Sequence, residues 1–211
     1  MKKQTLYKLT DENDCTYGDC QWGVGVTVHT SGEGELCGSG FTHWYTDPLL
    51  AVLLNPIHGD FDLRTAHLWE GEGVVKKRDY GLKVGCTNAT TLRRIELPKV
   101  TTTQRVAFAI YCAQEVSSDT GFMRWADVWL TGEDRSAEAA AKQAARAAEK
   151  TVRAAWAADY TARAAERAAR AAEQAAWAAD YTARAARAVE IDFIALARKA
   201  ITVKEVDTDE N

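Results

Sequence analysis

Short apolar runs, several of them alternating with polar residues, characterise the chain before Leu130. Apolar residues at every second position, as at Val24, Val26 and Val28, indicate a strand with one buried face. On this basis strands are predicted at residues 6–9, 22–29, 64–69, 82–86 and 92–97. Together with helices in the same region, these strands predict a small α+β domain.

Three segments before Leu130 have helical signals. Asp47 followed by Pro48 predicts a helix start, because aspartate caps a helix and proline suits its first position. Residues 103–116 and 122–130 have helical spacing of their apolar residues. Four apolar residues share one side of the last segment: Phe122, Trp125, Val128 and Trp129.

A change in composition marks a domain boundary near residue 133. All three prolines and all fourteen glycines precede it, and these residues are the strongest breakers of regular structure. Ser136 is a suitable N-cap for a helix that begins just after it. We therefore predict an N-terminal α+β domain at residues 1–132, an alanine-rich helical, coiled-coil-like region at residues 136–203, and an acidic disordered tail at residues 204–211.

The alanine-rich region contains an internal repeat. AAWAADYTARAA occurs at residues 154–165 and again at 175–186, an offset of 21 residues, or three heptads. A left-handed supercoil keeps one face in register over that interval. Four of the seven heptad columns hold only alanine or threonine, which favours close helix packing. The packing could be within the chain, as a hairpin, or between chains, as a homo-oligomer. Since no Gly or Pro in this region offers a turn, packing between chains is favoured. An isolated helix formed by alanine propensity is the alternative, and an ice-binding helix is a third.

Aromatic and arginine residues share another face of the repeat. They are the candidates for docking or recognition: Trp156, Tyr160, Arg163, Arg167, Arg170, Trp177 and Tyr181. The face could dock on another part of the protein, or it could stack bases and contact phosphates of single-stranded nucleic acid. A neighbouring acidic column, which includes Asp159 and Glu166, makes nucleic acid the less favoured partner.

Charge and cysteine usage narrow the class of protein. The net charge is −4, so no overall basic field attracts nucleic acid. Arginine, glutamate or aspartate interrupts the alanines, so no membrane span is expected, and the first residues do not resemble a signal peptide. The five cysteines have irregular spacing, which predicts reduced thiols and a cytoplasmic protein.

The densest cluster of polar and aromatic residues lies at residues 37–48, before and at the predicted helix start. We take as candidate ligand-binding residues Cys37, Phe41, His43, Trp44, Asp47 and, from a later strand, His67. Glycines in this segment allow a ligand close to the backbone, and a helix N-terminus attracts anions. A structural junction with buried aromatics and a capping aspartate is the alternative. A zinc site could be drawn from Cys15 and Cys20 with Cys37, Cys86 or His43, but there is no second pair of closely spaced ligands. No known nucleotide-binding motif is present either, so no metal or cofactor is expected.

Some of these residues carry a family resemblance. The runs Trp22-Gly23-Val24-Gly25, Leu36-Cys37-Gly38-Ser39-Gly40-Phe41-Thr42-His43 and Asp47-Pro48-Leu49 resemble an uncharacterised family of phage and prophage proteins. Members show an L-C-x-x-G-F-H turn followed by an N/D-P-L helix start, and they often continue into alanine-rich tails. This chain departs from the turn by having Thr42 before His43. The resemblance covers about residues 1–115 and implies a viral accessory origin without an established activity.

The leading hypothesis is a non-catalytic phage accessory protein for host takeover or counter-defence, acting in the host cytoplasm. It would oligomerise through its alanine helices and bind a host or defence protein, or a nucleotide signal, with its N-terminal domain. One alternative is an enzyme that modifies nucleotides or proteins with residues 37–47. Another is nucleic-acid binding by the arginine and aromatic helix face.

Overall fold

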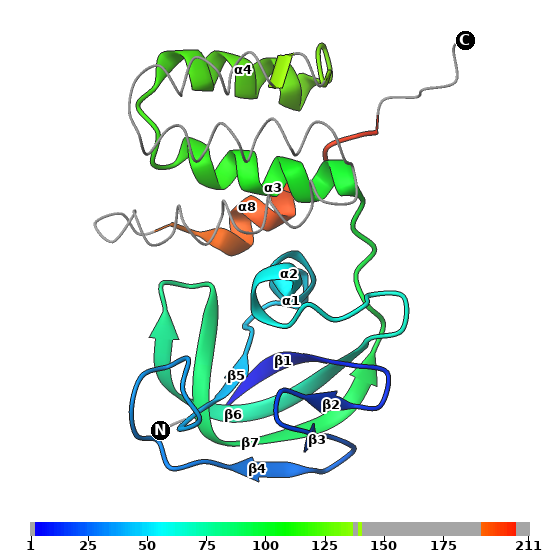
Figure 1. Cartoon of the computed structure of the whole chain (residues 1–211), viewed down its shortest axis with the longest axis vertical. Coiled ribbons are helices and arrows are strands. Elements are labelled where there is room, and N and C mark those ends of the chain that lie inside the picture. The colour runs from blue at the N-terminus through cyan, green and yellow to red at the C-terminus, as the bar shows by residue number, and fades with distance from the viewer. Residues whose placement is uncertain (1–2, 137–138, 141–190, 206–211) are drawn as a thin grey trace. The chain divides into compact units, whose positions relative to one another are not determined.

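The computed structural model describes residues 3–136, 139–140 and 191–205, which form two compact units (Figure 1). Of these residues, the first unit holds 3–99 and 191–197, and the second holds 100–136, 139–140 and 198–205. The first unit carries the strands and the second is helical. The predicted α+β class is confirmed. The sequence repeat and its candidate residues, from Trp156 to Tyr181, lie outside the described residues.

A long antiparallel hairpin organises the first unit. Its strands are β6 (His67–Asp79) and β7 (Lys83–Ile95), and we call residues 67–95 the long hairpin. Strand β1 (Gln4–Thr10) pairs with β6, while β4 (Thr27–His29) and β5 (Thr42–Trp44) pair with different parts of β7, all antiparallel. Register shifts within β6 and β7 mark bulges, which bend a hairpin and re-aim its side chains.

The strand predictions are right in part. The strand predicted at residues 6–9 is confirmed as β1. Most of the strands predicted at 82–86 and 92–97 belongs to one continuous strand, β7, because the threonine-rich residues between them also suit an extended chain. Leu82 lies in the turn before β7, and residues 96–97 lie beyond its end. The strand prediction is wrong for residues 22–26, which form a turn with Gly25 at a φ of +75°, and for residues 64–66, which form a turn after Asp62.

Two smaller features complete the first unit. Strands β2 (Cys15–Thr16) and β3 (Cys20–Gln21) form a separate ribbon, and we call residues 15–21 the short hairpin. Helices α1 (Pro48–Leu53) and α2 (Asn55–His58) follow β5. The predicted cap is confirmed, since the Asp47 carboxylate accepts a hydrogen bond from the backbone N–H of Leu49 at 2.9 Å.

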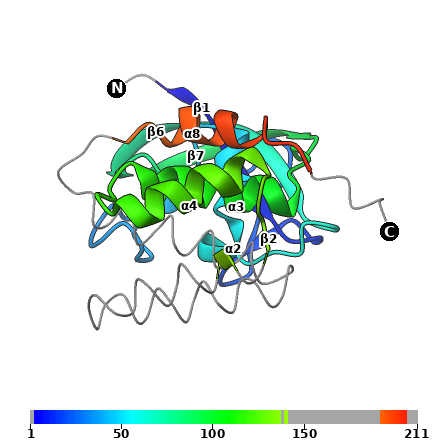
Figure 2. The same ribbon diagram turned by 90° about the horizontal axis from the view of Figure 1, so that it is seen from above.

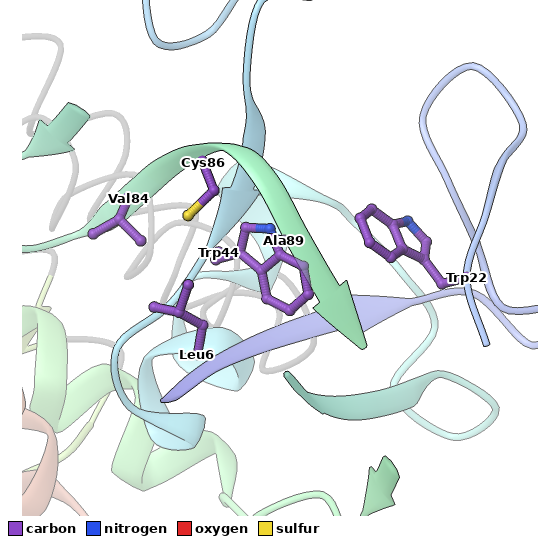
Figure 3. Close-up of a cluster of buried hydrophobic side chains, with 6 residues drawn as sticks. All are labelled: Leu6, Trp22, Trp44, Val84, Cys86 and Ala89. Atoms are coloured by element: carbon purple, nitrogen blue, oxygen red, sulfur yellow. The ribbon is translucent and has the colours of Figure 1, made fainter. Parts of the chain in front are cut away.

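Two tryptophans lie at the centre of a buried cluster, which Figure 3 shows with all its members: Leu6, Trp22, Trp44, Val84, Cys86 and Ala89. The rings of Trp22 and Trp44 meet edge to face, with centroids 5.3 Å apart. A Cβ on Gly71 would lie 2.7 Å from a ring carbon of Trp44 and 2.4 Å from the Thr90 carbonyl oxygen. Glycine at position 71 therefore lets the long hairpin pack directly on Trp44.

The second unit contains α3 (Thr102–Gln114) and α4 (Thr120–Thr131), which lie side by side in Figures 1 and 2. Thr101 and Gln104 form a capping box at the start of α3, and Asp119 caps α4. Both predicted helices are confirmed. From α8 (Phe193–Ala200), the Lys199 amine lies 4.0 Å from the ring centroid of Tyr111.

Ser136 behaves as predicted, because its hydroxyl accepts a hydrogen bond from the backbone N–H of Ala139 at 3.1 Å. In the part of the chain that the structure describes, no helix combines the length and the apolar content that a membrane crossing requires.

Candidate functional site

An open pocket of about 550 Å³ lies against the long hairpin in the first unit. Its lining comes from the last residue of β4 and the loop that follows, from the residue before β5, and from both strands of the long hairpin. The lining residues are His29, Thr30, Ser31, Gly32, Phe41, Lys76, Lys77, Thr87 and Asn88. We call it the lysine pocket. Its lining contains two lysines and a histidine and no carboxylate.

The loop wall of the lysine pocket is tied to β7 by backbone contacts. The Thr30 N–H donates to the Thr87 carbonyl at 2.9 Å, which extends the pairing of β4 with β7 by a further contact. Gly32 has a φ of +78°, and a Cβ there would lie 2.9 Å from the Thr87 methyl group. Glycine is thus required at position 32 for the chain to turn close to β7.

The two lysines line the same pocket although they are neighbours in one strand. In a regular strand, adjacent side chains point to opposite faces of the sheet. A register shift between Val75 and Lys77 interrupts this alternation in β6. The Lys77 amine donates to the Gly34 carbonyl at 2.6 Å and lies 5.2 Å from the Phe41 ring centroid, whereas Lys76 is exposed. Lys77 therefore holds the loop, and Lys76 presents its amine to solvent.

This lining has the chemistry of an anion site. Ammonium groups attract carboxylates and phosphates, and the Ser31 hydroxyl and the Asn88 amide can donate further hydrogen bonds. The Thr30 hydroxyl donates instead to the Cys86 carbonyl, at 3.4 Å. Glu33 and Glu35 are exposed on the loop beyond the pocket and do not line it.

The candidate residues at positions 37–47 do not form one site. Phe41 lines the lysine pocket, and Cys37 is exposed on the loop before it. The His43 Nε2 atom lies 2.5 Å from the Leu36 carbonyl oxygen, and burial lowers the pKa of this imidazole. Trp44 is fully buried in the core, and Asp47 caps α1. For His43, Trp44 and Asp47 these contacts agree with the alternative predicted from the sequence, a structural junction with buried aromatic residues and a capping aspartate.

His67 belongs to a different cluster, centred on Asp14. The Asp14 carboxylate accepts hydrogen bonds from His67 Nδ1 at 2.8 Å and from Trp69 Nε1 at 3.2 Å, and it pairs with the Arg94 guanidinium. Burial alone would raise the pKa of Asp14, but the hydrogen bonds from Arg94 and His67 outweigh it and lower that pKa. Asp14 precedes the short hairpin directly, so the cluster fastens this hairpin to the long one.

Sequence reasoning missed Asp14, His29, Lys76 and Lys77. The basic run Lys76-Lys77-Arg78 was a usable signal, because it is the densest group of positive charges before residue 130. No local signal pointed to Asp14, whose partners His67 and Arg94 are 53 and 80 residues away in the chain. Such pairings depend on the sheet topology.

All five cysteines lie in the described residues, and none forms a disulfide. Among those residues, no group of three or more histidine, cysteine, aspartate or glutamate side chains is arranged to hold a metal ion. The chain matches no protein-family model, and neither the curated proteins nor the solved structures contain a match to it.

Proposed function

We propose that this protein is a non-catalytic binding protein of viral accessory origin, whose first unit takes up a negatively charged ligand in the lysine pocket. The observation that carries the proposal is the lining of that pocket. The pocket is lined by Lys76, Lys77 and His29 and by no carboxylate, although the net charge of the chain is −4. A local concentration of positive charge on an acidic protein favours a specific anion site over general attraction to polyanions.

The ligand in this proposal is a phosphorylated small molecule such as a nucleotide signal, or an acidic segment of a host or defence protein. Both present oxygen anions that ammonium and hydroxyl groups bind. Catalysis receives less support, because the His43 and Asp47 side chains make local structural contacts instead of lining the pocket.

Calorimetric titration with ATP, with inorganic tripolyphosphate and with a glutamate-rich peptide tests the proposal. We expect at least one of the three to bind, and Lys76→Gln to weaken its binding about tenfold, which corresponds to roughly 1.4 kcal/mol. Lys99→Gln is the matched control, since Lys99 is exposed and lies outside the pocket. Equal binding by the two variants, or no binding of any of these anions, would contradict the proposal.

We also propose that the protein oligomerises through its alanine repeat. The support is the heptad spacing of the repeat and its broad face of small residues. Mass measurement of the full chain in solution tests this part, and a strict monomer at micromolar concentration would contradict it.

A further inference from the structure

Two hairpins of the first unit end in the same dipeptide. The last pair of the short hairpin is Thr16 with Cys20, and the residues it encloses are Tyr17, Gly18 and Asp19. The last pair of the long hairpin is Asp79 with Lys83, and it encloses Tyr80, Gly81 and Leu82. Each tip thus presents tyrosine followed by a glycine with positive φ, at +72° for Gly18 and +90° for Gly81.

The two hairpins carry opposite charge. Asp11, Glu12, Asp14 and Asp19 surround the short hairpin, and no lysine or arginine occurs between Lys8 and Arg64. Burial and the carboxylates of Asp11, Asp19 and Asp14 raise the pKa of the Cys15 thiol, as expected in a negative local field. In the long hairpin, strand β6 carries Lys76, Lys77 and Arg78 just before the turn, and the two lysines line the lysine pocket.

The short hairpin presents Tyr17 on a fixed base. Tyr17 is completely exposed, at 101% of its reference area. Beneath it, Asp14 bonds to the long hairpin, and the indole N–H of Trp22 donates to the Thr16 hydroxyl at 3.0 Å. Gln21 also donates to the Asn13 carbonyl, at 2.9 Å. A tyrosine side chain has only two rotatable side-chain angles and so loses little conformational entropy on binding, and tyrosine is frequent among the residues that dominate interface energies.

The acidic hairpin and the lysine pocket lie far apart along the same strand. Asp14 contacts His67 and Trp69 at the start of β6, whereas Lys76 and Lys77 lie near its end. Lys76 lies seven positions after Trp69, which is about 23 Å along a strand. In Figure 1 the labels β2 and β3 stand on the right of the sheet, and the turn between β6 and β7 lies on the left. A separation of this size favours contact between copies over contact within one chain.

We propose that the acidic short hairpin of one copy docks into the lysine pocket of a second copy. Tyr17 enters the pocket, and Glu12 and Asp19 pair with Lys76 and Lys77. The contact is head to tail, because it joins the short hairpin of one copy to a different surface, the lysine pocket, of the next. Contacts of this kind close into rings or continue as filaments. The inference rests on the proposed function, because it assigns one acidic occupant to the same pocket.

Charge reversal with full-length protein tests the contact. Glu12→Lys disables the acidic side, and Lys76→Glu disables the pocket; both positions are exposed. By sedimentation velocity at low salt, we expect each variant alone to associate at least tenfold more weakly than the wild type. An equimolar mixture of the two should regain association, because each variant keeps one intact surface. Tyr17→Ala should weaken association without altering any charge.

The outcomes separate this inference from the proposed function. Tripolyphosphate is titrated into the Glu12→Lys variant, whose pocket is intact. If the anion binds but neither single variant changes the sedimentation, the head-to-tail contact is wrong and the anion site stands. If no anion binds but the mixture regains association, the pocket serves self-assembly alone. If association is equal in the wild type and in all variants, it runs through other surfaces and the inference is overturned.

Discussion

The short and long hairpins share a tyrosine-glycine tip and differ in what supports it. In the long hairpin, Leu82 at the tip is buried at 1% exposure, and Tyr80 is 54% exposed. In the short hairpin the corresponding Asp19 is exposed, and Tyr17 is completely exposed. The long hairpin is thus held at its tip and along the sheet, whereas the short one is held at its base. Similar local sequence can produce either a turn anchored by a buried residue or a turn that is exposed throughout, and the contacts of the neighbouring residues decide which.

The largest effect is expected at the base of the short hairpin. Trp22→Ala removes a tryptophan that is 2% exposed and packs edge to face on Trp44. We expect a loss of about 3–5 kcal/mol in the free energy of unfolding, as for other large aromatic residues deleted from cores. Urea denaturation measures this loss.

Tyr17→Ala, at the tip of the short hairpin, is the matched control, expected within about 0.5 kcal/mol of the wild type because Tyr17 is fully exposed. Similar losses for the two variants would show that the tip is supported as firmly as the base, and the contrast between the hairpins would fail.

A second effect concerns a buried lysine beneath the short hairpin, in contrast to the exposed Lys76. The Lys8 amine donates to the His43 carbonyl at 2.9 Å and lies 4.5 Å and 5.2 Å from the ring centroids of Trp22 and Trp44. Burial lowers the pKa of Lys8 to about 8, against the smaller opposing influence of the Cys20 and Cys86 thiols. The folded protein therefore holds this proton less tightly than the unfolded chain does.

The consequence is a gain in stability with pH. Between about pH 8 and 10.4 the unfolded chain keeps a proton that the folded protein has released, so the free energy of unfolding rises with pH over this window. The contribution of Lys8 should amount to about 3 kcal/mol over the window. Urea denaturation of the wild type and of Lys8→Met measures it, at about pH 7.5 and about pH 10, which together span most of this window. The difference in the free energy of unfolding between the two proteins should change between these pH values. A pH-independent difference would contradict the shifted pKa.

The sequence predicted the helices and strands better than it predicted the lysine pocket. Caps and helical spacing located α1, α3 and α4, because these signals are local in the chain. The predicted strand over residues 22–26 failed because Gly23 and Gly25 bend the chain there and leave Val24 exposed. The lysine pocket could not be foreseen, since it depends on a bulge in β6 and on the approach of residues 29–32 to β7.

A third effect tests the fastening of the short hairpin. Asp14→Asn keeps a residue that tolerates the left-handed conformation, in which Asp14 has a φ of +63°, and removes the charge that pairs with Arg94. We expect a loss of about 2 kcal/mol at neutral pH, typical of a hydrogen bond to a charged group. Faster amide hydrogen exchange in residues 15–21 should accompany it.

The effect of Asp14 has a defined pH dependence. Because the pKa of Asp14 is lowered in the folded protein, its contribution is present above the unfolded value of about 3.9 and is lost as the pH falls through the folded pKa. The difference between wild type and Asp14→Asn should therefore shrink under acid conditions. A difference that is unchanged in acid would assign the loss to packing instead of charge.

The smallest effect separates the two tips. Tyr80 has a φ of +45°, a region that costs a side-chain-bearing residue roughly 1 kcal/mol, whereas Tyr17 is not among the residues with positive φ. Asparagine tolerates this region, so Tyr80→Asn should raise the free energy of unfolding by about 0.5 kcal/mol after the loss of some tyrosine packing. Tyr17→Asn should bring no gain. Equal gains at both tips, measured by thermal denaturation, would show that backbone strain does not distinguish them, and would leave charge and support as the differences between the hairpins.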